Sequence, residues 1–165
     1  PAARVMSELE ASDPYIEFRQ LGIVDRFGRK AVRTGSSNNP WAGHETGDGW
    51  VVMGNAVVDE GVVAAMAAAM RDHGAEDIET RLMHSISAGT DAGGQADGQR
   101  AAAVVVHENE GYPIVNLRVD DHDDPMQELW RLFHKMRPLV PYYRQRPDDP
   151  TLGRVVDWKK KHGIE

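Results

Sequence analysis

The segment between Arg33 and Asn55 contains the residues of this chain that are best suited to chemistry. Gly, Asn and Ser dominate it, and within this polar frame it carries two Trp, one His and a final Asn. Glycine lets a backbone approach a ligand closely and adopt conformations that other residues avoid. A loop that only joined two strands could be shorter and plainer. We therefore expect this segment to line a binding site.

Three side chains in this segment are candidates for direct roles. Asn55 follows a glycine at the end of a predicted strand, where an amide or backbone N–H could donate a hydrogen bond to an oxyanion. Asparagine also ends strands simply because it tolerates turn geometry. His44 could serve as an acid or base, although the seven histidines of the chain show no metal-ligand spacing. Trp41 and Trp50 either wall a pocket or attach the segment to the core.

A second group of polar residues alternates along a predicted strand over 114–120. Asn116, Arg118 and Asp120 share one face of this strand, because successive side chains point to opposite sides. If that face lines a cleft, Arg118 could hold a carboxylate through two parallel hydrogen bonds. If the face is exposed, Arg118 and Asp120 form a weak ion pair. The pattern leaves both interpretations open.

The run from Asp120 to Asp124 contains four acids and one His, and oxygen-rich loops of this kind can bind Ca²⁺ or Mg²⁺. However, EF-hand spacing is missing, and Asp124 is suited to cap the helix that follows it. Acids near a helix N-terminus are also favoured by the helix dipole. We therefore expect no metal site here, and no cofactor.

Composition restricts the classes of function. The chain has 165 residues, 41% of them hydrophobic and 27% charged, which fits one globular domain. A formal net charge of -7 argues against a nucleic-acid surface. No cysteine is present, so disulfides and thiolate chemistry are excluded. No apolar run has membrane-spanning length and no signal peptide is visible, so we expect a cytoplasmic protein without membrane contact.

The order of predicted elements is helix, hairpin, strand, two helices, hairpin, helix, which is typical of α+β proteins. A Gly-rich loop separates the first hairpin from the strand that ends at Asn55. Residues 1–136 are expected to form the domain, and 137–165, rich in Pro, Arg and Asp, an irregular tail. The predicted helices cover about 1–11, 59–73, 77–89 and 125–136, and the predicted strands cover 16–25, 29–34, 50–53, 101–106 and 113–119.

Several motifs, taken together and in order, resemble the DUF1028 family. That family is of unknown or poorly defined function and is placed in the N-terminal nucleophile (Ntn) hydrolase superfamily. The resemblance covers roughly residues 1 to 136. The motifs that carry it are Arg19–Asp25, Thr34-Gly35, Trp41–His44, Thr46–Gly49, Gly54-Asn55 and Leu117–His122.

The resemblance implies a four-layer αββα sandwich and hydrolysis of an amide bond by an N-terminal Thr, Ser or Cys, whose free α-amine acts as the base. The family's opening segment, with this nucleophile, is missing from the sequence, and Pro1 falls within the helix that follows it. Without that segment, the edges of the sheets would be unpaired and exposed. We therefore expect a companion N-terminal segment as a partner that completes the sandwich.

The resemblance also assigns roles to individual residues. Asn55 would be the oxyanion or substrate donor, and Trp41 and His44 would contact the substrate. Arg118 and Asp120 would orient either the substrate or the missing nucleophile. The expected function is an amidohydrolase subunit that cleaves a non-peptide C–N bond in a small amide. The alternative is a non-catalytic binding or scaffold protein on the same fold, including one associated with the cell wall. A homo-oligomer is a further expectation.

Overall fold

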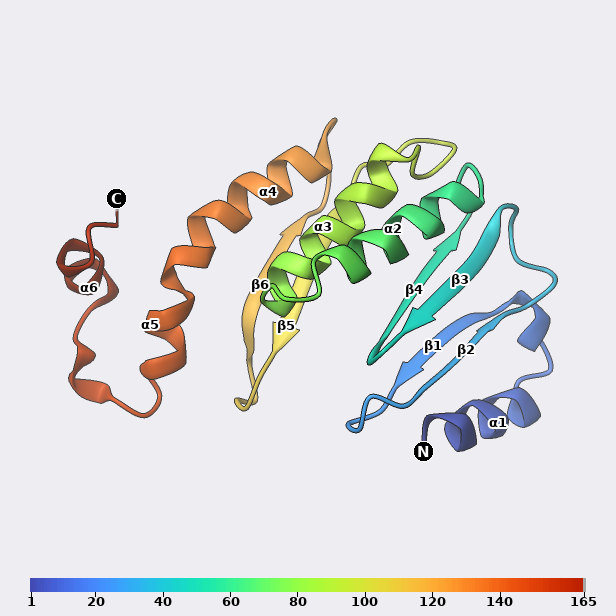
Figure 1. The fold of residues 1–165 in the computed structure, drawn as a ribbon, viewed down its shortest axis with the longest axis horizontal. Helices are drawn as coiled ribbons and strands as arrows, with labels where there is room; N and C mark the ends of the chain where they lie inside the picture. The colour runs from blue at the N-terminus through green and yellow to red at the C-terminus, as the bar shows by residue number, and fades with distance from the viewer. Residues whose placement is uncertain (165) are drawn as a thin grey trace. The chain divides into compact units, whose positions relative to one another are not determined.

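The computed structural model describes residues 1–164 and has an α+β fold with small sheets (Figure 1). The chain forms two compact units, which divide between Gly98 and Gln99, whereas the sequence predicts a domain boundary after residue 136. Each sheet in the described residues is a pair of antiparallel strands. No helix within residues 1–164 has the length and apolar character needed to cross a membrane.

The first unit begins with a helix that packs on a hairpin. Helix α1 (Ala2–Ser12) contacts strands β1 (Gln20–Val24) and β2 (Lys30–Thr34). The predicted helix and hairpin are thus present. The first strand begins at Gln20 rather than at residue 16, because Ile16–Phe18 form a turn of 3₁₀-helix, η1.

A second hairpin lies where the sequence predicts a long loop. Strand β3 (Ala42–Gly47) pairs with β4 (Trp50–Asn55), so the loop prediction is wrong over Ala42–Gly47. The strand is hard to recognise because it is polar and contains two glycines, which usually weaken strands. Both glycines have a packing role. A Cβ atom on Gly43 or Gly47 would lie 2.1 Å from the indole ring of Trp41 or Trp50, respectively.

Helix α2 (Glu60–Asp72) covers this second hairpin, and helix α3 (Ile78–Asp91) runs antiparallel to α2 (Figure 1). Helix α2 packs on β3 and β4, and its N-cap, Asp59, accepts a hydrogen bond from the Gly61 N–H at 2.8 Å. Helix α3 packs on α2. The residues at the centre of this core come from β4 and α2, namely Trp50, Val52, Val63, Ala67 and Met70.

The predicted apolar stripe of α3, formed by Ile78, Leu82 and Ile86, is confirmed in part. Leu82 packs against the core cluster of β4 and α2, whereas Ile78 is 44% exposed. The buried residues of α3 are Glu79, Thr80, Met83, Ser85 and Gly89. Small residues are among them because α3 packs closely against α2. The Ser85 hydroxyl donates to the carbonyl oxygen of Met66 at 3.1 Å, and a Cβ on Gly89 would lie 2.7 Å from the Met66 side chain.

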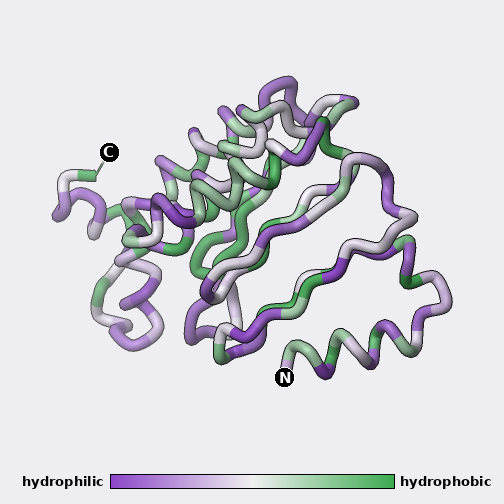
Figure 2. The backbone as a smooth tube through the Cα atoms, turned by 45° about the vertical axis from the view of Figure 1, so that its right-hand side comes forward, coloured by the Kyte–Doolittle hydropathy of each residue, from purple (hydrophilic) through white to green (hydrophobic). Residues whose placement is uncertain are grey.

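The second unit starts with strands β5 (Ala102–His107) and β6 (Pro113–Val119), followed by helix α4 (Pro125–Met136). Asp124 caps this helix as predicted, because its carboxylate accepts a hydrogen bond from the Gln127 N–H at 2.9 Å. Strand β5 was expected to be covered on both faces, but its burial alternates and Val105 is 50% exposed. Hydrophobic and hydrophilic residues follow one another closely along the strands (Figure 2).

The C-terminal residues, where the sequence predicts an irregular tail, contain regular helical turns. Tyr142 and Trp158 are buried with their ring centroids 5.6 Å apart, and the Tyr142 hydroxyl donates to the carbonyl oxygen of Gly153 at 2.8 Å. Pro138, Pro141 and Pro150 occupy first turns, where a missing N–H is tolerated. The helical elements are η2 (Arg137–Leu139), α5 (Val140–Gln145), η3 (Pro150–Leu152) and α6 (Val155–Lys161).

Candidate functional site

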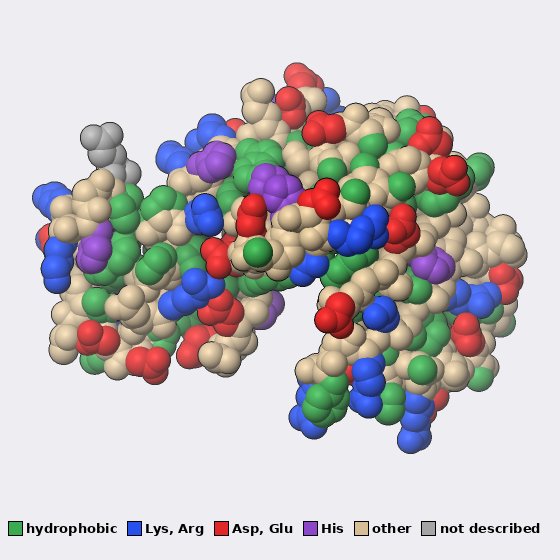
Figure 3. Space-filling view, viewed as in Figure 1, with side chains coloured by type: hydrophobic (Ala, Val, Ile, Leu, Met, Phe, Trp, Pro, Cys, Tyr) green, Lys and Arg blue, Asp and Glu red, His purple; other side chains and the backbone are tan. Residues whose placement is uncertain are grey.

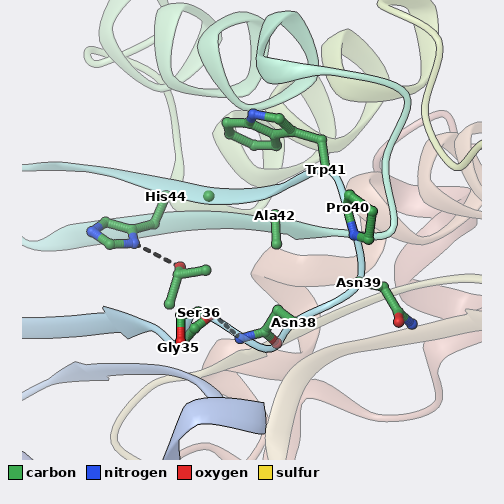
Figure 4. A pocket seen from close by; sticks show the side chains of 10 residues that line it. Gly35, Ser36, Asn38, Asn39, Pro40, Trp41, Ala42 and His44 are labelled. Carbon is green, nitrogen blue, oxygen red and sulfur yellow. Dashed lines mark hydrogen bonds between the residues drawn. The ribbon is translucent and has the colours of Figure 1, made fainter.

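A pocket of about 600 Å³ opens in the first unit between the end of β2 and the start of β3. Trp41 projects from it toward the helices, while Asn38 and the backbone at Gly35 form the opposite wall (Figure 4). The pocket thus lies in the segment that the sequence singles out. Its lining residues are Thr34, Gly35, Ser36, Asn38, Asn39, Pro40, Trp41, Ala42, Gly43 and His44.

A hydroxyl and an imidazole meet at one end of this pocket. The Thr34 Oγ1 atom lies 2.8 Å from Nδ1 of His44 (Figure 4). The Nε2 atom of Gln20 lies 3.1 Å from the same hydroxyl oxygen. Two carbonyl oxygens, those of Gly43 at 3.0 Å and Gly54 at 2.8 Å, also accept from the Gln20 amide and thereby fix its orientation.

The Thr34 hydroxyl can act in either direction in its contact with His44. The Gln20 amide nitrogen can only donate, so the Thr34 oxygen accepts from it. With one proton and a second lone pair, the hydroxyl can then either donate to Nδ1 of His44 or accept from it. His44 is exposed and lines the pocket, so its imidazole is accessible to a ligand.

Two asparagines form the polar wall. Asn55, at the end of β4, donates from Nδ2 to Oδ1 of Asn38 at 2.7 Å. Asn38 in turn donates to the carbonyl oxygens of Gly35 at 2.8 Å and Arg19 at 3.1 Å. Asn38 lines the pocket, while Asn55 is not among the lining residues. Asn55 therefore supports the wall from behind, through Asn38.

The two tryptophans take different positions. Trp50 is buried in the core, which fits the structural interpretation. Trp41 both lines the pocket and packs against the core cluster of β4 and α2. Its backbone is fixed by paired hydrogen bonds with Val57, at 3.1 and 3.2 Å. Trp41 is thus a rigid apolar wall next to the two asparagines and His44.

Glu17 fastens the start of the pocket segment to the turn η1. Its carboxylate accepts hydrogen bonds from the Ser36 backbone N–H at 3.0 Å and hydroxyl at 2.9 Å, and pairs with the Arg33 guanidinium. These bonds, those from Ser36 foremost, lower the pKa of Glu17 from its usual value. Next to it, Gly35 is required, because a Cβ there would lie 2.3 Å from the Glu17 carbonyl oxygen.

Arg118 and Asp120 lie in the second unit, whereas every residue that lines the pocket belongs to the first. Their side chains are 69% and 72% exposed, and Nη2 of Arg118 lies 2.5 Å from Oδ1 of Asp120. Of the two interpretations of this strand face, the structure therefore agrees with the exposed ion pair. Such pairs are common on the drawn face, where acidic and basic side chains are interspersed (Figure 3). Exposed pairs contribute little to stability.

The acid-rich run after β6 is also explained by its contacts. Asp121 and Asp123 pair with Arg100 at 2.5 and 2.8 Å, and Asp124 caps α4. The hydrogen bond and charge of Arg100 lower the pKa of Asp121.

Gln20, Asn38 and Glu17, which shape the pocket, were not identified from the sequence. The one available signal was the pair of asparagines in the Gly-rich segment, which marks polar side chains without specifying their partners.

The comparisons with known proteins agree on one family. The sequence model of DUF1028, a family of unknown function, matches residues 1–129, and the chain belongs to this family. The crystal structure of a DUF1028 protein from Silicibacter pomeroyi is similar, with 31% sequence identity and a TM-score of 0.69. The similarity covers 81% of this chain and 59% of that one, so the chain spans less than two thirds of the solved relative. No match was found among curated proteins.

Proposed function

We propose that this chain is the larger part of an amidohydrolase of the Ntn class, acting on the non-peptide C–N bond of a small amide. The observation that carries the proposal is the pocket, which combines one rigid aromatic wall with a hydrogen-bonded pair of amides and a hydroxyl–imidazole pair. A concave site that places an aromatic ring beside oriented polar groups is typical of sites that bind small molecules. The proposal includes a cytoplasmic location and a complete four-layer αββα sandwich.

In this proposal the nucleophile is supplied by a companion segment. An N-terminal Thr, Ser or Cys attacks the carbonyl carbon while its α-amine takes the proton. The C–N bond then breaks, the proton passes to the leaving amine, and water hydrolyses the acyl-enzyme. The length of the solved relative, of which this chain spans 59%, supports a contribution from further residues.

The residues of this chain would bind and orient the amide. Asn38, held by Asn55, offers a fixed polar wall to the amide group, and Trp41 contacts the apolar part of the substrate. The imidazole of His44 would donate a hydrogen bond to the developing oxyanion or to a second polar group. Preorganised donors of this kind stabilise charge without reorganisation during the reaction.

The proposal is tested on the natively purified protein by intact-mass measurement and N-terminal sequencing, followed by assays of ammonia or amine release from a panel of small amides. A co-purifying fragment that begins with Thr, Ser or Cys, and that is acylated by a β-lactone probe, is the expected result. A fragment with another first residue and no turnover would support the non-catalytic binding protein instead. Retention on peptidoglycan would then indicate a role at the cell wall.

A further inference from the structure

Two histidines and one glutamate meet at the connection between α2 and α3, in a place that the proposed hydrolase does not use. The residues are His73, which ends α2, Glu76 in the connection, and His84 in the second turn of α3. One ligand atom from each residue lies within 4.8 Å of the others. We propose that these three residues bind a divalent cation of the zinc class and that this cation joins the two helices.

The distances between donor atoms are those that a small cation requires. Nδ1 of His73 lies 2.9 Å from Oε1 of Glu76, and Nε2 of His84 lies 3.6 Å from Oε2 of the same carboxylate. Zinc with bonds of about 2.1 Å holds tetrahedral ligands about 3.4 Å apart. The two separations fall on either side of this value. Glu76 is thus placed to contribute an oxygen between the two imidazoles.

The chemistry of the donors selects the class of cation. Imidazole nitrogen with one carboxylate oxygen suits Zn²⁺ and neighbouring transition metals, whereas Ca²⁺ and Mg²⁺ prefer oxygen ligands only. Three protein ligands leave a fourth tetrahedral position for water. We therefore expect Zn²⁺, Ni²⁺ and Co²⁺ to bind, and Mg²⁺ and Ca²⁺ to bind much more weakly.

The backbone that presents these side chains is well fixed. The Glu76 N–H donates to the carbonyl oxygen of His73 at 3.0 Å, which closes the turn and sets the carboxylate beside the first imidazole. Arg81 donates from Nε to the carbonyl oxygen of Met70 at 2.6 Å and ties α3 to the last turns of α2. Ligands on packed helices are held more accurately than ligands on loops.

One adjustment is needed for a cation to bind. The rings of His73 and His84 are stacked, with centroids 3.8 Å apart and an interplanar angle of 10°. The lone pairs of parallel rings run side by side, so the rings must tilt toward each other to share one ion. The histidine χ2 torsion is soft, and the two side chains are 33% and 35% exposed, which leaves an open side for this rotation.

The test is calorimetric titration of the tag-free, metal-stripped chain with zinc chloride. One Zn²⁺ per chain is expected, with a rise in the thermal midpoint of at least about 3 °C at saturation. His84→Ala should weaken binding by at least about tenfold and Glu76→Gln should also weaken it, because each removes a ligand. His107→Ala, which removes an exposed histidine of the second unit, should leave affinity unchanged. Cobalt binding should give the intense visible absorption of a tetrahedral site.

Binding of Zn²⁺ with equal affinity by His84→Ala, or no binding by the wild type, would overturn the proposal and leave a stacked histidine pair with an adjacent carboxylate. If a variant does not fold, an NMR measurement on the wild type alone still tests the proposal. The imidazole ¹⁵N signals of His73 and His84 should shift on addition of zinc, and unchanged signals would also overturn it. The result is independent of the hydrolase proposal, because turnover of amides is not the readout.

Discussion

Thr34 and His44 come from neighbouring hairpins and are joined by a hydrogen bond of 2.8 Å between Oγ1 and Nδ1. Gln20 completes this arrangement, because its amide donates both to the Thr34 oxygen and to carbonyl oxygens of β3 and β4. One side chain of β1 thus holds the second hairpin against the first. The same contacts hold the ring of the histidine that lines the pocket.

Replacement of Thr34 by Val should therefore change the state of His44 rather than the fold. Valine keeps the shape but removes the hydroxyl, which leaves the Gln20 N–H and the His44 Nδ1 without this partner. We expect a loss of stability of about 1–3 kcal/mol. Long-range ¹H–¹⁵N spectra should show a shift of the His44 Nδ1 signal between the wild type and the variant, because Nδ1 loses its hydroxyl partner. Thr34→Ser, which keeps the hydroxyl, should give the wild-type spectrum, and a shift as large as that of Thr34→Val would contradict this role for the hydroxyl.

Replacement of Asn55 by Ala should lower amide turnover while the fold persists. The change removes the donor to Asn38 and so loosens the polar wall of the pocket. Removal of a direct oxyanion donor lowers kcat by about 10²-fold or more. Asn55 acts through Asn38, so we expect a smaller loss of kcat. Asn109→Ala, an exposed residue of the second unit, is the matched control and should keep full activity. Equal rates for the two variants would remove Asn55 from the site.

The sequence predicts most helices and two of the three hairpins, because these elements have clear caps, apolar periodicity and turn residues. Asp59 and Asp124, for example, act as N-caps as their positions indicate. The strand β3 was missed since Gly43 and Gly47 are there to make room for indole rings, which a local pattern does not reveal. The inward face of α3 was predicted at Leu82 but not at Ser85 or Gly89, because small and polar residues that contact the neighbouring helix give no apolar signal.

The candidate site was predicted in part for a similar reason. Its location follows from glycine content and from the rare side chains Trp41 and His44, both of which line the pocket. The residues whose hydrogen bonds shape the pocket are Gln20, Asn38 and Glu17. They are distant in sequence from their partners, or their residue types are too common to indicate a site. A single sequence contains no information on such contacts until the strands are placed next to each other.

Replacement of Gly43 by Ala should destabilise the first unit. The new methyl group would lie 2.1 Å from the Trp41 ring, so the indole must leave its place against the core. Overpacking of this kind costs about 1–3 kcal/mol. Denaturant unfolding followed by tryptophan fluorescence measures the loss and the displacement together. Gly111→Ala, where a Cβ meets nothing within 4 Å, is the control, and similar stability of both variants would contradict this role for Gly43.

Asp25 should make stability depend on acid pH. Desolvation raises its pKa, but hydrogen bonds from Arg29, Phe27 and Ala2 outweigh this and lower the pKa from 3.8 to about 2. The folded state therefore favours the carboxylate, and its contribution is complete above pH 4 and is lost as the pH falls toward 2. The stability difference between wild type and Asp25→Asn should narrow over this range. The same titration of Asp48→Asn, an exposed acid in the β3–β4 turn, is the control.

Ala56, directly after Asn55, has a φ of 58°, in the left-handed region that favours glycine. In the folded state, this conformation costs an alanine about 1–2 kcal/mol of strain, which glycine does not have. Glycine instead lowers stability by about 0.4–1 kcal/mol, because it increases the conformational freedom of the unfolded chain. Ala56→Gly should therefore raise stability by about 0.5–1 kcal/mol in urea unfolding. Ala64→Gly on the exposed face of α2 adds the same freedom without relieving strain, and should lower stability by about 1 kcal/mol. A gain of stability in Ala56→Gly together with a loss in Ala64→Gly would show that the residue next to Asn55 is strained. A loss of stability in both variants would mean that the backbone at position 56 is not strained.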